Sequence, residues 1–413
     1  MTDAMTGVDS RFPQLRAELA RLSDTDAQDW YPVFKARYGM QVVLEQLHAL
    51  RGDGDVLTQL FTCCTAVVPI IAAGLSPRYA DIDADTLALT PGACDQSPTP
   101  AAEGRGSALR GVIIQHTFGI QAERESADLA RRARAAGALV MEDAAHCVAR
   151  LARADELQPL ADVSFHSFGV QKILPTHFGG AVWVNPALGS RDPGLDSALR
   201  AALAGLPPLS PRLDAASRMY RNQARVLARV PQAVSSPARA AASRLGLLDP
   251  PVARAEQGGQ LPYAPMAPSQ WVAGRATAAL HELTAANTAR IRIVNSFRQT
   301  LPELPGVSVP GAVIGGEPEP LLRFPLLLPD TAQAEHLITA MRAIGVFAER
   351  WGRPLLYPGV DGKTALKAFR VPPEGLPVTH DVSARVVALP TELDNDRAAR
   401  AVRLAQEWSR HRG

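Results

Sequence analysis

Short apolar runs alternate with amphipathic stretches of helix length over the first half of the chain. The apolar runs are typical of buried strands and fall at residues 55–60, 77–82, 112–116, 138–141, 163–168 and 181–184. Apolar side chains recur at helical spacing between several of these runs, in residues 39–50, 66–73 and 123–136. The repeated order of strand, helix and strand predicts an α/β fold with a mostly parallel sheet and right-handed crossovers.

The pattern changes near residue 269. Residues 270–301 are predicted to form one long helix, and the remainder alternates a strand at 321–328 with helices at 331–344 and 396–409. We therefore expect a large domain over residues 1–268, followed by a linking helix and a smaller α+β domain over residues 269–413. A chain of 413 residues, 46% of them hydrophobic, is long enough for two or three domains.

Residues 186–262 interrupt the large domain as an insertion. The stretch is rich in Ala, Arg and Pro and is predicted to form broken helices. Seven arginines stand against one acid, Asp214, between residues 211 and 244. One interpretation is a solvated basic arm or a dimer contact, and the other is a weak membrane-surface contact with anionic lipid.

Composition excludes several other classes of function. The net charge of +2 gives no reason to expect nucleic acid as a partner. The four cysteines, Cys63, Cys64, Cys94 and Cys147, have neither metal-ligand spacing nor the pattern of a disulfide framework, so no metal is expected. No apolar run approaches 18 residues and the first residues lack the features of a signal peptide, which predicts a cytoplasmic protein.

One lysine stands out because the chain otherwise uses arginine. Of the 43 Lys and Arg residues only four are Lys: Lys35, Lys172, Lys363 and Lys367. Arginine stays protonated, whereas a buried lysine can act as an amine nucleophile. Lys172 lies between two predicted strands, and the other three lie in polar context and are expected to be exposed. Lys172 alone is compatible with an exposed loop, so its neighbours decide the interpretation.

The neighbours include two acids, Glu142 and Asp143, at the end of the apolar run 138–141. Ligands of open α/β folds bind at the carboxyl ends of the strands. Because Asp143 ends one predicted strand and Lys172 follows the next, we expect their side chains to meet at that edge of the sheet.

The order and spacing of these segments resemble the DegT/StrS-type sugar aminotransferases, which are pyridoxal-phosphate enzymes with the aspartate aminotransferase fold. The matching motifs are E-D-A-A-H from Glu142, S-F-x-x-x-K from Ser167 to Lys172, and G-G-A-V from Gly179. The resemblance covers about residues 37–185 and 263–410. It implies pyridoxal 5′-phosphate, a seven-stranded sheet in the large domain, and a homodimer with shared sites. The aromatic residues Trp30, Tyr31 and Phe34 are expected to pack on the large domain or on the partner subunit.

The resemblance also implies roles for single residues. Lys172 would carry the cofactor covalently and move the reacting proton, and Asp143 would pair with the pyridine nitrogen. His146 would lie on the O3′ side of the ring, and Ser167 would donate to the phosphate. A core histidine and a serine that caps its own backbone are the structural alternatives.

Other positions depart from the family pattern. Gly39 and Met40 stand where the family's Gly-Thr pair holds the phosphate, so only backbone contacts carry over; a plain helix start at Gly39 is the alternative. Cys63 replaces the aromatic residue that stacks on the ring, and it would otherwise be a buried structural cysteine. Tyr263 and Pro265 replace the Asn and Arg of the family's N-x-R-M segment, whose asparagine reaches the other subunit's cofactor.

The implied reaction is transfer of an amino group, typically from glutamate, to a keto-sugar nucleotide. The pathway would be biosynthesis of a glycan, a cell-surface polysaccharide or a secondary metabolite. Sugar dehydratases of the same fold carry histidine in place of the lysine, so Lys172 favours transamination. The departures from the family pattern also leave open a non-catalytic protein that acts as a binding or scaffold partner.

Overall fold

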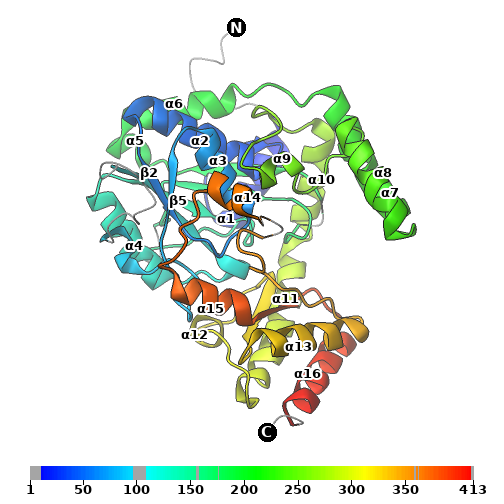
Figure 1. Ribbon diagram of the computed structural model, residues 1–413. Coiled ribbons are helices and arrows are strands. Elements are labelled where there is room, and N and C mark those ends of the chain that lie inside the picture. Colours follow the sequence, from blue (N-terminus) through cyan, green and yellow to red (C-terminus); the bar gives the residue numbers. More distant parts are fainter. Residues whose placement is uncertain are drawn as a thin grey trace.

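The protein is described by a computed structural model covering residues 11–95, 108–154, 158–174, 176–357, 360 and 362–410. Figure 1 shows a large lobe built around a sheet and a smaller lobe that contains the C-terminal helices. Each lobe has its own cluster of buried apolar side chains. None of the helices in the described ranges is long and apolar enough to cross a membrane.

Seven strands form the central sheet in the order β1-β7-β6-β5-β4-β2-β3. Their bounds are Trp30–Val33, Asp55–Thr58, Ser76–Tyr79, Leu109–Gln115, Leu139–Asp143, Val163–Ser167 and Gly180–Val184 for β1 to β7. The pairs from β3 across to β6 are parallel, and β7 runs antiparallel to both β6 and β1. The predicted α/β class and mostly parallel seven-stranded sheet are therefore confirmed, with strand ends shifted by a few residues.

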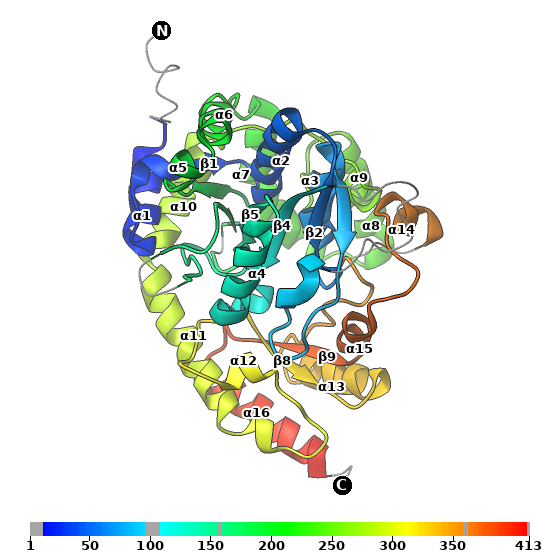
Figure 2. The same cartoon turned by 90° about the vertical axis from the view of Figure 1, so that its left-hand side faces the viewer.

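Helices cover both faces of this sheet (Figure 2). Their bounds are α1 Pro13–Ser23, α2 Ala36–Arg51, α3 Cys64–Ala72 and α4 Glu123–Ala135. The alternation along β4 explains the two layers, because successive side chains of a strand point to opposite faces. Ile113 lies in the core that contains α2, and its neighbours Val112 and Ile114 lie in the core that contains α4.

Strand β1 was not predicted from the sequence. It contains Trp30 and Tyr31 of the expected aromatic cluster, and all four of its residues are buried. Pro32 is tolerated there because β1 lies at the edge of the sheet, where a missing N–H costs no ladder hydrogen bond. The Trp30 ring lies 4.9 Å from the ring of His166. The cluster therefore packs on the large lobe of its own chain.

Helix α2 begins at Ala36, three residues before the predicted start at Gly39. Gly39 lies inside the helix, where an added Cβ would come within 2.4 Å of Val182 Cγ2. The glycine is therefore needed for close packing of α2 on β7, and it does not open the helix.

The predicted helix 270–301 is divided into α10, Gln270–His281, and α11, Leu283–Arg298. Residues of α10 such as Ala276 and Leu280 pack in the core of the large lobe, whereas Phe297 of α11 packs in the core of the small lobe. The two helices run down one side of the molecule and join the lobes (Figure 2). The domain boundary at residue 268 stays a prediction, since α10 still belongs to the larger core.

The small lobe combines the antiparallel pair β8, Arg323–Leu327, and β9, Val386–Pro390, with helices α12 Gly311–Ile314, α13 Thr331–Ala343, α15 Pro377–Arg385 and α16 Asn395–Arg410. Between β8 and β9 the chain returns to the large lobe through α14, Lys363–Ala368. Leu356 and Phe369 pack there with Leu60 and Tyr79. This return places residues 351–357 against the large lobe.

The insertion forms the predicted broken helices α5 Leu188–Arg191, α6 Pro193–Ala204, α7 Pro211–Ala228, α8 Gln232–Arg244 and α9 Arg254–Gln257. Helices α7 and α8 project together from the large lobe as an arm (Figure 1). Met219 and Val226 on α7 are 55% and 60% exposed. After the arm, the chain turns back toward α3 and the start of α2.

Candidate active site

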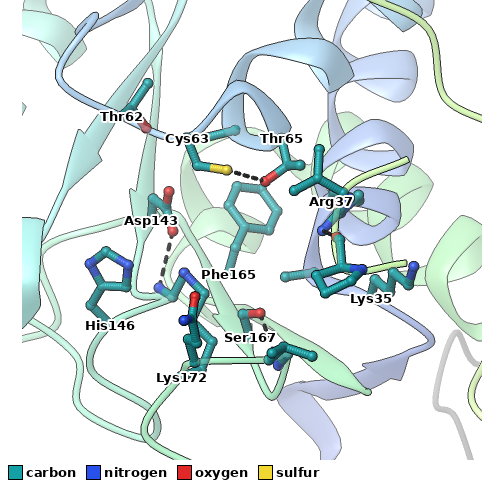
Figure 3. Close-up of a pocket in the computed structure, with 18 of the residues that line it drawn as sticks. Lys35, Arg37, Thr62, Cys63, Thr65, Asp143, His146, Phe165, Ser167 and Lys172 are labelled. Carbon is teal, nitrogen blue, oxygen red and sulfur yellow. Dashed lines mark hydrogen bonds between the residues drawn. The ribbon is translucent and has the colours of Figure 1, made fainter. Parts of the chain in front are cut away.

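A cavity lies at the carboxyl ends of β5 and β6, beside the start of α2 (Figure 3). Six of the seven cofactor-binding residues predicted from the sequence line it: Met40, Cys63, Asp143, His146, Ser167 and Lys172. Gly39 does not line the cavity and contacts Val182 instead. Ala36 and Arg37, in the first turn of α2, line the cavity instead.

Lys172 follows β6 and lines the cavity as a half-buried residue whose amine is desolvated. Burial lowers the pKa of its amine, and the positive charges of Arg37 and Arg323 act in the same direction. Cys63 and Asp143 oppose this shift by favouring the charged form. A lysine with a lowered pKa presents more of the neutral amine, which is the nucleophilic form.

Asp143 is the last residue of β5, and β5 is paired on both sides, with β4 and β6. One carboxylate oxygen, Oδ1, accepts a hydrogen bond of 3.0 Å from the amide of Ala145. Burial raises the pKa of this carboxyl, and the charge of Lys172 opposes the rise. A buried carboxylate held rigidly at a strand end can pair with a protonated ring nitrogen.

His146 is held in one orientation by its neighbours. Its Nδ1 accepts a hydrogen bond of 3.1 Å from the amide of Phe118, and its ring lies 5.2 Å from the ring of Trp351. Burial lowers its pKa well below the ordinary histidine value, and Lys172 acts in the same direction. A neutral ring whose Nδ1 accepts must carry its proton on Nε2, so His146 is a hydrogen-bond donor in this site.

Ser167 ends β6, and its Oγ accepts a hydrogen bond of 3.3 Å from the amide of Gly169. This bond is the backbone cap that was the structural alternative for the serine. It leaves the hydroxyl hydrogen free to donate to a ligand in the cavity. The two interpretations of Ser167 are therefore compatible.

Cys63 precedes α3, and its Sγ accepts a hydrogen bond of 3.0 Å from Thr65 Oγ1. The thiol of Cys64, hydrogen-bonded to Cys63, lowers the pKa of Cys63; burial opposes this, and the charge of Lys172 adds to the lowering. The resemblance predicts an aromatic residue at this position, whereas the thiol is a polarizable group that carries charge easily. Figure 3 shows Cys63 on the opposite side of the cavity from Lys172.

The sequence did not identify two cations that line the cavity, Lys35 and Arg37. Lys35 is only 9% exposed, so the expectation that it lies in an exposed polar segment is wrong. Its Nζ lies 2.7 Å from Asp249 Oδ2, and Arg37 pairs with Glu256. Both carboxylates belong to the insertion, so no local motif around Lys35 or Arg37 indicates these partners.

Further lining residues were also missed. Thr62 donates to Gln115, whose Nε2 donates to Thr117 Oγ1 over 2.8 Å, so the end of β4 is joined to the loop before α3. Trp351 and Tyr357 come from the segment that returns from the small lobe. Their rings lie 5.2 Å apart, and together they close one side of the cavity.

The segment that stands for the family's N-x-R-M folds onto its own chain. The Tyr263 hydroxyl is 3.5 Å from Asp249 Oδ1, and the Met266 carbonyl accepts a hydrogen bond of 3.0 Å from the amide of Phe34. Of the histidines that the sequence could not rank, His177 lines the cavity. His116 binds Glu142 over 2.5 Å and His166 binds Ser164 over 3.0 Å, and neither lines it.

The residues present fit pyridoxal phosphate. A buried amine and a buried carboxylate, Lys172 and Asp143, share one cavity with the aromatic ring of Phe165. The hydroxyl of Ser167 and the first turn of α2 line the same cavity and are suited to binding an anionic group. Strand order, the two-lobed architecture and this donor set together define the fold class of pyridoxal-phosphate-dependent transferases.

Comparison with known proteins finds a family match over part of the chain. Residues 35–190 match the DegT/DnrJ/EryC1/StrS aminotransferase family. A relative, the spore coat polysaccharide biosynthesis protein SpsC of Bacillus subtilis (strain 168), is 34% identical over 130 residues, which are 31% of this chain and 31% of SpsC. The aligned stretch thus spans about a third of that curated relative. The resemblance predicted from the lysine segment is confirmed.

Solved structures extend the likeness of the fold over nearly the whole chain. The aminotransferase TlmJ from Streptoalloteichus hindustanus has a TM-score of 0.64 at 18% identity, with 97% of this chain and 91% of TlmJ covered. DesI, solved in the presence of its TDP-sugar product, has a TM-score of 0.62 at 22% identity, with 97% and 87% covered. At such low identity these matches establish the fold, and the fold class predicted from the sequence is confirmed.

Proposed function

We propose that this chain is a pyridoxal-phosphate-dependent aminotransferase with Lys172 as its catalytic residue. The observation that carries the proposal is the burial of the Lys172 amine and the Asp143 carboxylate in one cavity at the ends of two adjacent strands. Such a pair combines a nucleophilic amine with a group that can hold a proton on a pyridine nitrogen.

Pyridoxal phosphate, when bound, supplies the electron sink for deprotonation of the carbon that carries the amino group. Asp143 would hold the proton on the ring nitrogen. His146 would donate from Nε2 to the ring oxygen, because its Nδ1 is already occupied by the Phe118 amide. Lys172 Nζ would take the proton from one carbon and return it to another, and its lowered pKa keeps it ready to accept.

Trp351 and Tyr357 line the cavity from the small-lobe segment, where they would exclude water from the reacting atoms. Ser167 and the first turn of α2 would bind the phosphate. Met40 supplies no hydroxyl and lies inside α2, so the backbone contacts would come from the amides of the first turn, such as those of Ala36 and Arg37.

For substrates, we propose glutamate as the amino donor and a keto-sugar nucleotide as the acceptor. The support is the family match together with two named relatives, a spore coat polysaccharide biosynthesis protein and DesI with its TDP-sugar product. The reaction would serve the biosynthesis of a glycan, a cell-surface polysaccharide or a secondary metabolite. We further propose that the protein works in the cytoplasm as a homodimer.

The test is to load the protein with pyridoxal phosphate, reduce it with borohydride and map the modified peptide. We expect the label on Lys172 and a visible absorbance band before reduction. Lys172→Ala should abolish both signals. A label on Lys35 or Lys363 instead of Lys172 would disprove the assignment.

The second candidate function is a binding or scaffold protein that has lost turnover. It is favoured by Cys63 at the position of the ring-stacking aromatic, and by Tyr263, which contacts Asp249 of its own chain. The two functions are separated by amino-group transfer from glutamate to pyridoxal phosphate in a single turnover. A chain that binds the cofactor but performs no such transfer is the scaffold protein.

A further inference from the structure

Two buried cations at the start of α2 are held by two carboxylates of the insertion. Lys35 Nζ lies 2.7 Å from Asp249 Oδ2, and Arg37 Nη1 pairs with Glu256 Oε1. The Asp249 and Glu256 side chains are only 2% and 1% exposed. Both cations line the cavity beside the first turn of α2, whereas neither carboxylate is among the residues that line it.

The two carboxylates lie in residues 249–257, which we call the strap. Arg37 also donates from Nη2 to the carbonyl of Pro251 over 2.8 Å. Glu256 accepts a hydrogen bond of 2.6 Å from the amide of Ala253 through its other oxygen. Pro251 and Val252 line the cavity. The strap therefore covers this end of the cavity and is tied to it by contacts with Lys35 and Arg37, and α9 also packs against α3.

The charges at this end balance only while the strap is closed, because two cations face two carboxylates. A phosphate placed beside Lys35 and Arg37 would add a second pair of negative charges close to Asp249 and Glu256. Like charges in a poorly hydrated site repel strongly. A phosphate would therefore compete with the strap carboxylates for the two cations.

The pair of Lys35 and Asp249 is held by charge, with Nζ and Oδ2 2.7 Å apart. Burial lowers the pKa of Lys35, and the charge of Asp249 opposes this most strongly. Lys35 thus requires an anion beside it to remain charged, and a phosphate meets that need as well as a carboxylate does.

We propose that Lys35 and Arg37 bind the phosphate of the cofactor, and that Asp249 and Glu256 occupy these cations until the phosphate displaces them. The strap is then a built-in competitor that opens as the phosphate binds. This inference rests on the proposed function for the identity of the ligand. Lys35 and Arg37 would then supply the positive charge that binds the phosphate, at a site where Met40 offers no hydroxyl.

Binding of inorganic phosphate, measured by calorimetry, tests the competition without the chemistry of Lys172. Asp249→Asn and Glu256→Gln remove the competing charge and keep the shape, so each should bind phosphate at least about fivefold more tightly than the unchanged protein. Lys35→Met and Arg37→Met should lose binding. Asp29→Asn is the matched control, because Asp29 also pairs with a mostly buried arginine, Arg200, but does not line the cavity.

Trypsin cleavage after the exposed Arg254 reports on the strap directly. We expect phosphate to speed this cleavage, and potassium chloride of equal ionic strength to leave it unchanged. If Glu256→Gln does not fold, Asp249→Asn decides the binding test. Equal or weaker phosphate binding by the carboxylate variants, or protection of Arg254 by phosphate, overturns the inference.

The outcome is separate from that of the proposed function. Lys172→Ala should still bind inorganic phosphate with the same dependence on Asp249 and Glu256. A protein whose strap responds to phosphate but whose Lys172 takes no pyridoxal phosphate would retain the inference about the anion site and lose the aminotransferase proposal.

Discussion

Cys63 and Lys172 line the same cavity, and each favours the charged form of the other. The Cys64 thiol contributes most to lowering the pKa of Cys63, and the Lys172 charge adds to it. In turn, Cys63 opposes the lowering of the Lys172 pKa by burial more than Asp143 does. The thiol at the position of the family's aromatic residue therefore changes the charge of the site as well as its shape.

Cys63 should be the fastest thiol to react with iodoacetamide at neutral pH, because the thiolate is the reactive form. The substitution Lys172→Met removes the positive charge of the amine, so it should raise the pKa of Cys63 and slow its alkylation. Cys94, whose pKa is raised by burial, is an internal reference within the same protein. Mass spectrometry of the labelled peptides measures both rates. Equal rates at Cys63 and Cys94 would contradict the prediction.

Asp143→Asn should keep the fold and the cofactor content but lower turnover by about 10²-fold or more. The amide can still accept the hydrogen bond from Ala145, but it cannot balance a proton on the ring nitrogen. Asp162→Asn is a control at a buried carboxylate away from the cavity. Turnover that is unchanged in Asp143→Asn would mean that this strand end does not face the ring nitrogen.

His166 should make the protein less stable in mild acid. Burial lowers its pKa from 6.5 to about 4. The unfolded chain therefore takes up a proton below about pH 6.5 that the folded chain refuses until about pH 4, and stability falls as the pH decreases through this window. The loss is up to about 3 kcal/mol. Denaturant unfolding of the native protein and His166→Gln at several pH values should show a flatter profile for the variant.

The protein is expected to be a homodimer. The aromatic cluster gives no support, since β1 packs into the sheet of its own chain. Exposed apolar side chains at the arm, Met219, Val226, Leu245 and Leu247, offer a surface for a second copy. Light scattering gives the mass in solution. A monomer that binds the cofactor tightly would exclude a shared site.

The α7–α8 arm should bring the protein to anionic liposomes at low salt and release it at high salt. Arg221 and Arg225 on α7 and Arg229 directly after it are exposed, and each arginine near an anionic surface contributes about 1 kcal/mol. Sedimentation with and without the substitutions Arg221→Gln, Arg225→Gln and Arg229→Gln measures the effect. Absence of co-sedimentation at low salt leaves the arm as a solvated surface or a dimer contact.

The sequence by itself determined the α/β class, six of the seven strands, and the meeting of Asp143 with Lys172. These features follow from local patterns. Apolar runs and helical spacing predict the strands and helices, and the spacing of the motifs places Asp143 and Lys172 at the ends of two of the strands. Parallel pairing then brings the strand ends to one edge of the sheet, as observed for β5 and β6.

Only the tertiary structure decided that β1 joins the sheet, that α2 starts at Ala36, and that Lys35 is buried against Asp249. Each of these features depends on a partner far away in the chain. Strand β1 pairs with β7, Gly39 of α2 packs against Val182, and the strap pairs with the two cations. The residues on either side of Lys35, Phe34 and Ala36, do not indicate which carboxylate lies beside its amine. Burial and charge pairing are set by what packs over a residue, and local sequence does not contain that information.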